Sequence, residues 1–208
     1  NKNILKNIKL TFSNCGINID RIILKSFVEG INFLLKNQNN KSFAAITLEN
    51  KRTNISLFKN KSYVLTQDFN FGIDLIVKDI SKLCSLKINE VEFILKKIDL
   101  KSVLENDKEL YLENFFFSNS PYRKIKYQLI LDIITARLEE LIEICYEKNK
   151  NLDYLIKTNN MICITIDKND YFKNIKFALE KNKLTNSNFV YNKNSGTEVL
   201  SSLNGAAD

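Results

Sequence analysis

The middle of the chain carries three short apolar runs joined by polar turns. Residues 43–48 (FAAITL), 54–58 (NISLF) and 62–68 (SYVLTQD) are rich in the β-branched, aromatic and aliphatic side chains that strands favour. The tripeptide Lys59-Asn60-Lys61 separates the last two runs. Because successive strands joined by brief turns pair with one another, this pattern predicts an antiparallel meander.

Apolar residues recur at helical spacing through much of the remaining chain. Helices are predicted from Ser26 to about Leu35 and over residues 74–84, 89–97, 122–148 and 171–181. Further strands are predicted over residues 8–12, 22–24, 152–156, 161–166 and 189–191. Residues 99–121 are expected to be irregular, with an apolar cluster at residues 115–117, and residues 192–208 to form a polar tail.

The order of these elements predicts an α/β fold that carries an inserted helical lobe. Strands dominate the first part, helices the middle, and strands with a helix return near the end. We place the sheet-based unit at residues 1–74 and 149–208, and the helical lobe at residues 75–148.

Composition removes several kinds of site. The chain has no histidine, which excludes a Ser–His–Asp triad, a Cys–His pair and imidazole metal ligands. Its five glycines lie too far apart to form a glycine-rich phosphate loop. The four cysteines are widely spaced and mostly in apolar settings, which predicts buried free thiols rather than a zinc site. We therefore predict no catalytic residue and no metal site.

The net charge of +7 by itself favours a nucleic-acid partner. However, the chain has only four arginines, and its many lysines are interspersed with acidic residues and asparagines. Readers of nucleic acid usually depend on arginine. A solvated basic surface is therefore favoured over a nucleic-acid module, and no nucleic-acid partner is predicted. No apolar run approaches the length of a membrane span, and no signal peptide opens the chain.

The stretch from residue 43 to residue 80 resembles the second phosphate hairpin of the actin-like superfamily, and more closely the bacterial cell-division family FtsA. In that family a strand leads into Asp-Ile-Gly-Gly-Gly-Thr-Thr, and a hairpin, a Gly-Gly pair and a helix with Asp-Ile follow. Here residues 45–54 (AITLENKRTN) occupy the loop position, Gly72 the Gly-Gly position and Asp79-Ile80 the helix position. The most specific match is residues 133–141 (IITARLEEL), where FtsA proteins carry Ile-Ile-x-x-Arg-x-Glu-Glu.

This resemblance extends over about residues 10–180 and implies an actin-like (ribonuclease H-like) subdomain of type 2A with an inserted helical lobe of type 2B. It also implies a piece that lacks the N-terminal half of the family's fold. The family binds ATP, and the positions that match its nucleotide site are Thr47, Thr53, Asn54, Gly72 and Thr165. Glutamate, asparagine and lysine replace the loop's glycines, and Ile166-Asp167 replaces a glycine pair in the adenosine loop. These departures predict a degenerate nucleotide site and no enzymatic activity.

In FtsA the 2B lobe receives the acidic C-terminal tail of the tubulin-like protein FtsZ. The resemblance implies that this chain is a cytoplasmic adaptor, which self-associates and links FtsZ to the inner face of the bacterial membrane through a segment outside the sequence. Four basic residues of the lobe are the candidate contacts for the tail: Arg123, Lys124, Lys126 and Arg137. The alternatives are another actin-like scaffold, such as the pilus-assembly protein PilM, and an actin-fold ATPase.

Overall fold

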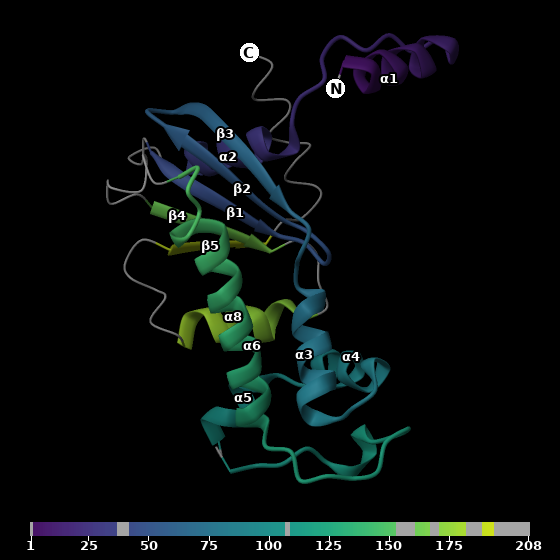
Figure 1. Cartoon of the computed structure of the whole chain (residues 1–208), viewed down its shortest axis with the longest axis vertical. Coiled ribbons are helices and arrows are strands. Elements are labelled where there is room, and N and C mark those ends of the chain that lie inside the picture. Colours follow the sequence, from purple (N-terminus) through teal and green to yellow (C-terminus); the bar gives the residue numbers. More distant parts are fainter. Residues whose placement is uncertain are drawn as a thin grey trace.

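A five-stranded mixed sheet forms the centre of the molecule (Figure 1). The computed structural model describes residues 2–36, 42–106, 109–152, 161–166, 171–181 and 189–193. The strands lie in the order β3-β2-β1-β4-β5. β2 runs antiparallel to its neighbours β1 and β3, and β4 runs parallel to its neighbours β1 and β5. Their bounds are β1 Phe43–Leu48, β2 Thr53–Lys59, β3 Ser62–Phe69, β4 Met161–Ile166 and β5 Phe189–Lys193.

The predicted meander is confirmed. β2 and β3 are joined by Asn60 and Lys61, both with positive φ, which is the backbone of a type I′ hairpin turn. Every residue of β1 is buried because this strand lies inside the sheet with helices over both faces. In β3, by contrast, exposed residues alternate with half-buried ones, as on a strand with one solvated face.

Helix α2 (Lys25–Lys36) covers one face of the sheet. Its Phe33 packs with Phe43, Phe58 and Cys163, the side chains that point to this face from three strands. Gly30 allows the close approach, since a Cβ there would lie 1.9 Å from the Phe58 ring. The predicted helix from Ser26 is thus confirmed, and it begins one residue earlier.

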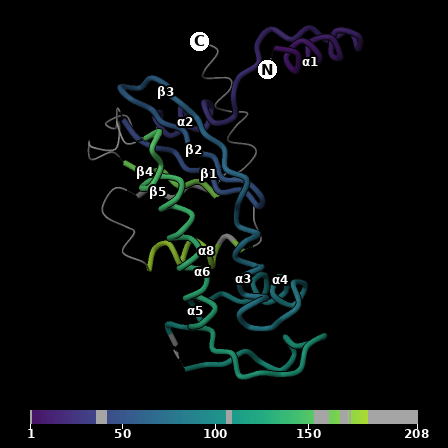
Figure 2. Tube along the Cα trace, in the orientation of Figure 1, coloured from purple at the N-terminus to yellow at the C-terminus, as the bar shows by residue number. Residues whose placement is uncertain are grey.

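Apart from the N-terminal helix, the other helices lie on the side of the opposite face of the sheet and extend away from it (Figure 2). A continuous core joins Ile46, Ile55 and Ile164 of the strands to the apolar faces of these helices. They are α3 Asp74–Cys84, α4 Ile88–Lys97, α5 Leu100–Asn106, α6 Tyr127–Ile142 and α8 Phe172–Lys181, with a 3-10 turn at Asn114–Phe116 and a π turn at Glu143–Glu147. The division into residues 1–74 with 149–208 and residues 75–148 stays a prediction.

Several sequence predictions are wrong. Residues 8–12 lie inside helix α1 (Lys2–Asn14), and residues 22–24 form no strand. The segment 99–121 contains α5 and the 3-10 turn, and α6 begins at Tyr127 rather than at residue 122. The proposed strand at 152–156 falls almost entirely outside the described residues, as does most of the polar tail.

All four cysteines are unbridged, and three of them are buried, as predicted. Burial raises the pKa of Cys84, and it raises the pKa of Cys145 to about 12. Among the described helices, none combines the length and the apolar character needed to cross a bilayer.

Candidate functional site

A small cavity of about 240 Å³ opens between the start of α2 and the turn that joins β1 to β2. This turn, residues 49–52, occupies the position that matches the phosphate loop of the actin-like superfamily. Two predicted site residues, Thr47 and Asn54, line the cavity. Its remaining lining is Leu24, Lys25, Ser26, Glu29, Glu49, Arg52, Thr66 and Asp68.

Several polar side chains that line this cavity are hydrogen-bonded or ion-paired with one another. Thr47 Oγ1 donates to Glu29 Oε2 at 2.9 Å, and Lys25 Nζ contacts Glu49 Oε1 at 2.8 Å and Glu29 Oε1 at 3.7 Å. The lining also contains Arg52 and Asp68. It thus carries three carboxylates and two cations. A phosphate group would therefore enter a cavity with an excess of negative charge, which is repulsive.

The backbone of the turn is also engaged. The amide of Glu49 donates to the Arg52 carbonyl at 2.9 Å, within the hairpin. The amides of Ile73 and Asp74, at the start of α3, donate to the Glu49 and Asn50 carbonyls at 3.0 and 2.9 Å. The turn is thereby fastened to α3, and the Glu49 amide is not free to cradle an anion.

The other predicted nucleotide residues have structural partners. Thr53 is fully buried and donates to the Phe71 carbonyl at 2.9 Å. Asn54 donates to Thr66 and Asp68 of β3, at 2.8 and 2.9 Å. Thr165 is buried on β4, in register with Thr47 of β1. The structure thus brings four of the five residues together at one end of the sheet, with Gly72 behind the turn.

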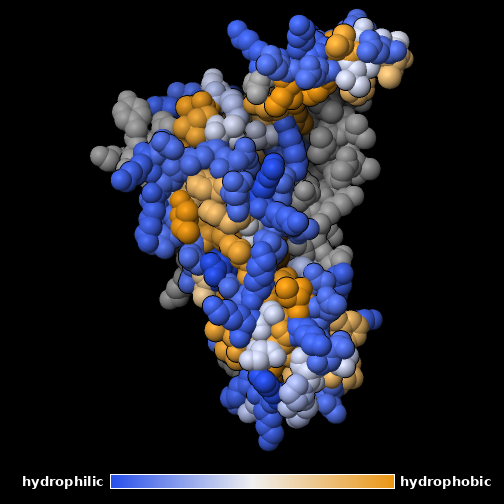
Figure 3. Space-filling view, turned by 45° about the vertical axis from the view of Figure 1, so that its right-hand side comes forward, coloured by the Kyte–Doolittle hydropathy of each residue, from blue (hydrophilic) through white to orange (hydrophobic). Residues whose placement is uncertain are grey.

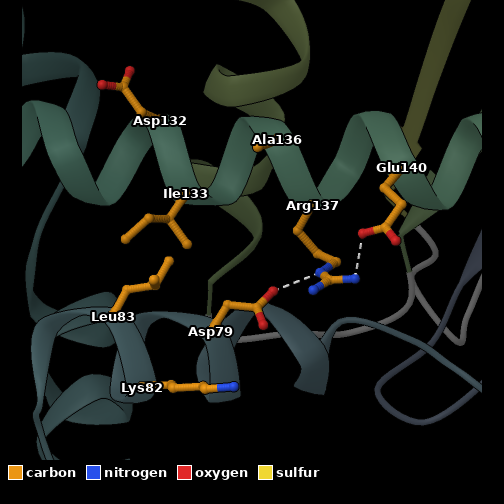
Figure 4. Close-up of a pocket in the computed structure, with 8 residues that line it drawn as sticks. All are labelled: Asp79, Lys82, Leu83, Asp132, Ile133, Ala136, Arg137 and Glu140. Atoms are coloured by element: carbon orange, nitrogen blue, oxygen red, sulfur yellow. Dashed lines mark hydrogen bonds and ion pairs between the residues drawn. The ribbon is translucent and has the colours of Figure 1, made fainter.

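A second, larger hollow of about 480 Å³ lies between α3 and α6 (Figure 4). Leu83 and Ile133 face each other across it, and Ala136 lies above them on α6. Its charged lining comprises Asp79, Lys82, Asp132, Arg137 and Glu140. Leu83 is 66% exposed, so the hollow offers an apolar floor with a charged rim.

Arg137, one of the four basic candidates for a partner contact, is partly buried between α3 and α6, with its side chain 24% exposed. Its Nε lies 2.5 Å from Asp79 Oδ2 of α3, and its Nη1 donates to Glu140 one turn along α6. The hydrogen bond that Arg137 donates to Asp79 raises the pKa of Arg137, and the charges of Asp79 and Glu140 add to this. With two carboxylates bound, this guanidinium joins α3 to α6 and is already neutralised.

The other three basic candidates lie together just before α6. Lys126 Nζ contacts Glu109 Oε2 at 2.5 Å, and this hydrogen bond raises the pKa of Lys126. Arg123 and Lys124 are exposed on an extended segment and make no side-chain ion pair with any residue that the structure describes. The sequence placed all three inside the helix. Since α6 starts at Tyr127, Arg123 and Lys124 lie outside the helix.

Sequence reasoning missed a buried carboxylate that positions this segment. Glu90 of α4 is 2% exposed and accepts hydrogen bonds from the backbone amides of Lys87 and Asn119, at 2.9 and 2.8 Å, and from Ser120 Oγ at 2.5 Å. Burial raises the pKa of Glu90, but these hydrogen bonds lower it by more. Its bond with Lys87 is a local cap of the helix, but Asn119 and Ser120 lie 29 and 30 residues away, and spacing along the chain gives no signal for them.

Replacing Glu90 by glutamine is expected to lower the free energy of unfolding by roughly 2 kcal/mol at pH 7. The stabilisation by the ionised carboxylate is complete above its unfolded pKa, roughly 4.3, and is lost as the pH falls through the lower pKa of the folded state. Urea unfolding at pH 7 and at pH 4 measures this. The variant should lose less stability than the parent between these two pH values, whereas the control Glu92→Gln should match the parent at both.

Comparison with known proteins gives one distant relative by sequence. No protein-family model matches the chain. The cell division protein FtsA of Neisseria meningitidis is 22% identical over 137 residues, which cover 66% of this chain and 33% of that protein. The chain therefore spans about a third of the length of the curated relative that it matches.

Solved structures match much more of the chain. MreB5 of Spiroplasma citri bound to ADP aligns with a TM-score of 0.55 and 14% identity, over 98% of this chain and 63% of that one. The chain has an actin-like fold. ParM of Bacillus thuringiensis with ATP gives a TM-score of 0.52 and 16% identity, over 83% of this chain and 49% of that one. A PilM–PilN type IV pilus biogenesis complex gives 0.50 and 11%, over 88% and 45%. The actin-like fold expected from the sequence is confirmed.

Proposed function

We propose that this actin-like chain is a divergent FtsA-like adaptor, which links FtsZ filaments to the inner face of the cytoplasmic membrane at the division site. The similarity to FtsA over two thirds of the chain carries this proposal. The solved structures agree in fold, and at identities of 11–16% they do not favour one actin-like family over another. Self-association belongs to the same proposal.

The adaptor is proposed to act without ATP hydrolysis. The charged network of Lys25, Glu29 and Glu49 supports this, because it occupies the groups that would face a phosphate. The backbone hydrogen bonds from α3 to the β1–β2 turn support it further, since they hold the turn in its present form. We accordingly propose that neither ATP nor another cofactor is needed.

The end of the helical region beyond the sheet is the proposed contact for the FtsZ tail. Exposed aromatic side chains lie in this segment: Phe115 is 59% exposed, and Tyr122 is 49% exposed and packs edge-on against Phe117, with ring centroids 5.1 Å apart. Arg123 and Lys124 follow Tyr122 directly. Basic side chains beside an apolar shelf suit a short peptide that is both acidic and apolar.

The double variant Arg123→Glu and Lys124→Glu is expected to weaken binding of an FtsZ C-terminal tail peptide at least tenfold. Each reversal replaces an attraction for the acidic tail by a repulsion. Fluorescence anisotropy of the labelled peptide measures the affinity. The matched control reverses Lys51 and Lys61, two exposed lysines in the turns of the sheet, and so changes the net charge equally. The control should bind the peptide like the parent.

Equal weakening by both double variants would show that only net charge matters, and would remove the contact from the helical region. No binding by the folded parent chain would overturn the FtsA-like function and favour a PilM-like scaffold. Calorimetry of the same samples with ATP tests the proposal that the chain acts without a nucleotide. Saturable binding of ATP would overturn the proposal that the chain needs no nucleotide, and hydrolysis of the bound ATP would favour an actin-fold ATPase.

A further inference from the structure

A further cavity, of about 510 Å³, opens in the part of the helical region that lies away from the sheet (Figure 1). Its walls come from α4, α5, the 3-10 turn and the start of α6. Hydrophobic side chains reach the surface between hydrophilic ones in this lower part of the molecule (Figure 3). The volume of the cavity is in the range of pockets that hold small ligands or single side chains.

Aromatic rings line one side of this cavity. The ring of Phe116 is 4% exposed, and its centroid lies 5.8 Å from that of Phe93 on α4 and 4.0 Å from that of Phe115. Phe93 and Phe115 are 41% and 59% exposed, so they bring ring surface to the mouth of the cavity. The electron-rich face of an aromatic ring attracts a cation.

Tyr127 of α6 adds a polar group to the lining. The residue is 6% exposed, and its hydroxyl has no hydrogen-bond partner among the residues that the structure describes. No fully enclosed side-chain nitrogen or oxygen of the described residues lacks a partner, so this hydroxyl reaches open space, and the cavity is the space that Tyr127 lines. Burial raises the pKa of Tyr127, and the charge of Glu113 adds to this. The hydroxyl is therefore protonated at neutral pH and can face a ligand.

Two carboxylates give the cavity its charge. Glu113 is exposed, and its side chain makes no hydrogen bond or ion pair with any residue in the described part of the chain. Asp99 accepts from the amides of Lys101 and Ser102 at 3.1 and 3.4 Å, both through Oδ1. Lys97 is the one cation of the described lining, and it pairs with neither carboxylate. Two carboxylates and one ammonium leave an excess negative charge, which favours a cationic ligand.

We propose that this cavity binds the guanidinium group of an arginine side chain that a partner protein presents. A guanidinium stacks its flat face on an aromatic ring while its N–H groups donate to carboxylates in its plane. Phe93 and Phe115 offer the ring faces, and Glu113 offers a carboxylate. The hydroxyl oxygen of Tyr127 is a further acceptor.

The exposed rings at the mouth favour a protein over a free small molecule as the source of the guanidinium. A small cation would leave much of Phe93 and Phe115 in solvent, whereas the residues on either side of an arginine would cover them. The proposal does not depend on the contact proposed for the FtsZ tail. Phe115 borders both surfaces, so the variants that test the cavity leave it unchanged.

An NMR titration of the whole chain tests the proposal. The probe is the peptide acetyl-Leu-Arg-Leu-amide, and its neutral match carries citrulline, in which an oxygen replaces one nitrogen of the guanidinium. The arginine peptide is expected to shift the backbone amide signals of residues 113–116, and the citrulline peptide to bind about tenfold more weakly. N-butylguanidine carries the same cation without the flanking residues, and it should bind about fivefold more weakly than the arginine peptide.

Two variants locate the binding in the cavity. Glu113→Gln should weaken binding of the arginine peptide about tenfold, and Phe93→Leu roughly threefold. Both residues are exposed, so neither change threatens the fold. Glu105→Gln is the matched control, because it removes the same charge from an exposed position on α5 that does not line the cavity. It should bind the peptide like the parent.

Equal weakening by Glu113→Gln and Glu105→Gln would overturn the proposal, because only net charge would then matter. Equal binding of the arginine and citrulline peptides would also overturn it and would identify a purely apolar pocket. Butylguanidine that binds as tightly as the peptide would make a free small cation the occupant, and no binding by the folded parent would remove the site. Glu113→Gln and Phe93→Leu should leave binding of the FtsZ tail peptide unchanged, so the failure of one proposal is distinguishable from the failure of the other.

Discussion

Replacing Gly72 by alanine is expected to destabilise the chain by about 3 kcal/mol, a large effect for the addition of a single methyl group. An added Cβ would lie 2.3 Å from the Glu49 carbonyl oxygen, 2.6 Å from that of Asn50 and 2.8 Å from the Arg52 nitrogen. All three atoms belong to the backbone of the β1–β2 turn, which the Ile73 and Asp74 amides hold against α3. The turn cannot move aside without breaking these hydrogen bonds.

Thermal unfolding followed by circular dichroism measures the effect of Gly72→Ala. A loss of about 3 kcal/mol corresponds to a melting temperature lower by roughly 6–12 °C for a domain of this size. Asn70→Ala is the control, an exposed position two residues earlier in the same connection, and it should change the melting temperature little. A Gly72→Ala variant as stable as the Asn70→Ala control would mean that the turn is not fastened to α3 as described.

Replacing Asn174 by leucine is expected to lower the free energy of unfolding by roughly 3 kcal/mol. Asn174 of α8 is 1% exposed. Its Oδ1 accepts from the Leu100 amide at 3.0 Å, and its Nδ2 donates to the Leu95 and Ile98 carbonyls at 2.9 and 3.0 Å. Leucine has a similar volume but makes none of these bonds, so three backbone groups would remain buried without this partner.

Urea unfolding compares Asn174→Leu with Lys173→Ala, an exposed change one residue earlier on the same helix. The control should stay within about 0.5 kcal/mol of the parent. A loss of less than about 1 kcal/mol in Asn174→Leu would mean that the junction of α4 and α5 does not depend on this side chain. These bonds join α8 to the junction of α4 and α5, which lies more than 70 residues earlier in the chain.

The structure bears differently on the two sites that the sequence predicts. The positions proposed for a nucleotide do lie together, but Thr47, Thr53 and Asn54 are hydrogen-bonded to other groups of the protein, and Gly72 acts through close packing. The basic residues proposed to contact a partner differ in whether their charges are available. Arg137 binds Asp79 and Glu140, while Arg123 and Lys124 lie exposed directly after Tyr122. The assays proposed for the adaptor function therefore target the latter pair.

Local patterns alone located most of the secondary structure. The runs of apolar residues at 43–48, 54–58 and 62–68 became strands because their turn residues and strand preferences act over a few positions. Residues 74–84 form a helix with the predicted bounds, because their apolar side chains recur at helical spacing over the same short range. Where two periods fit one segment, as at residues 8–12, the pattern did not decide between strand and helix.

The sequence by itself determined the meander and the main amphipathic helices. It also excluded sites that need histidine or a glycine-rich loop, and through one resemblance it indicated the actin-like fold. Only the tertiary structure decided which charged groups are available. Arg137 finds Asp79 at a separation of 58 residues, Glu90 finds Asn119 at 29, and Asn174 finds Leu100 at 74. Contacts at such separations depend on how whole helices pack, and no spacing along the chain records them.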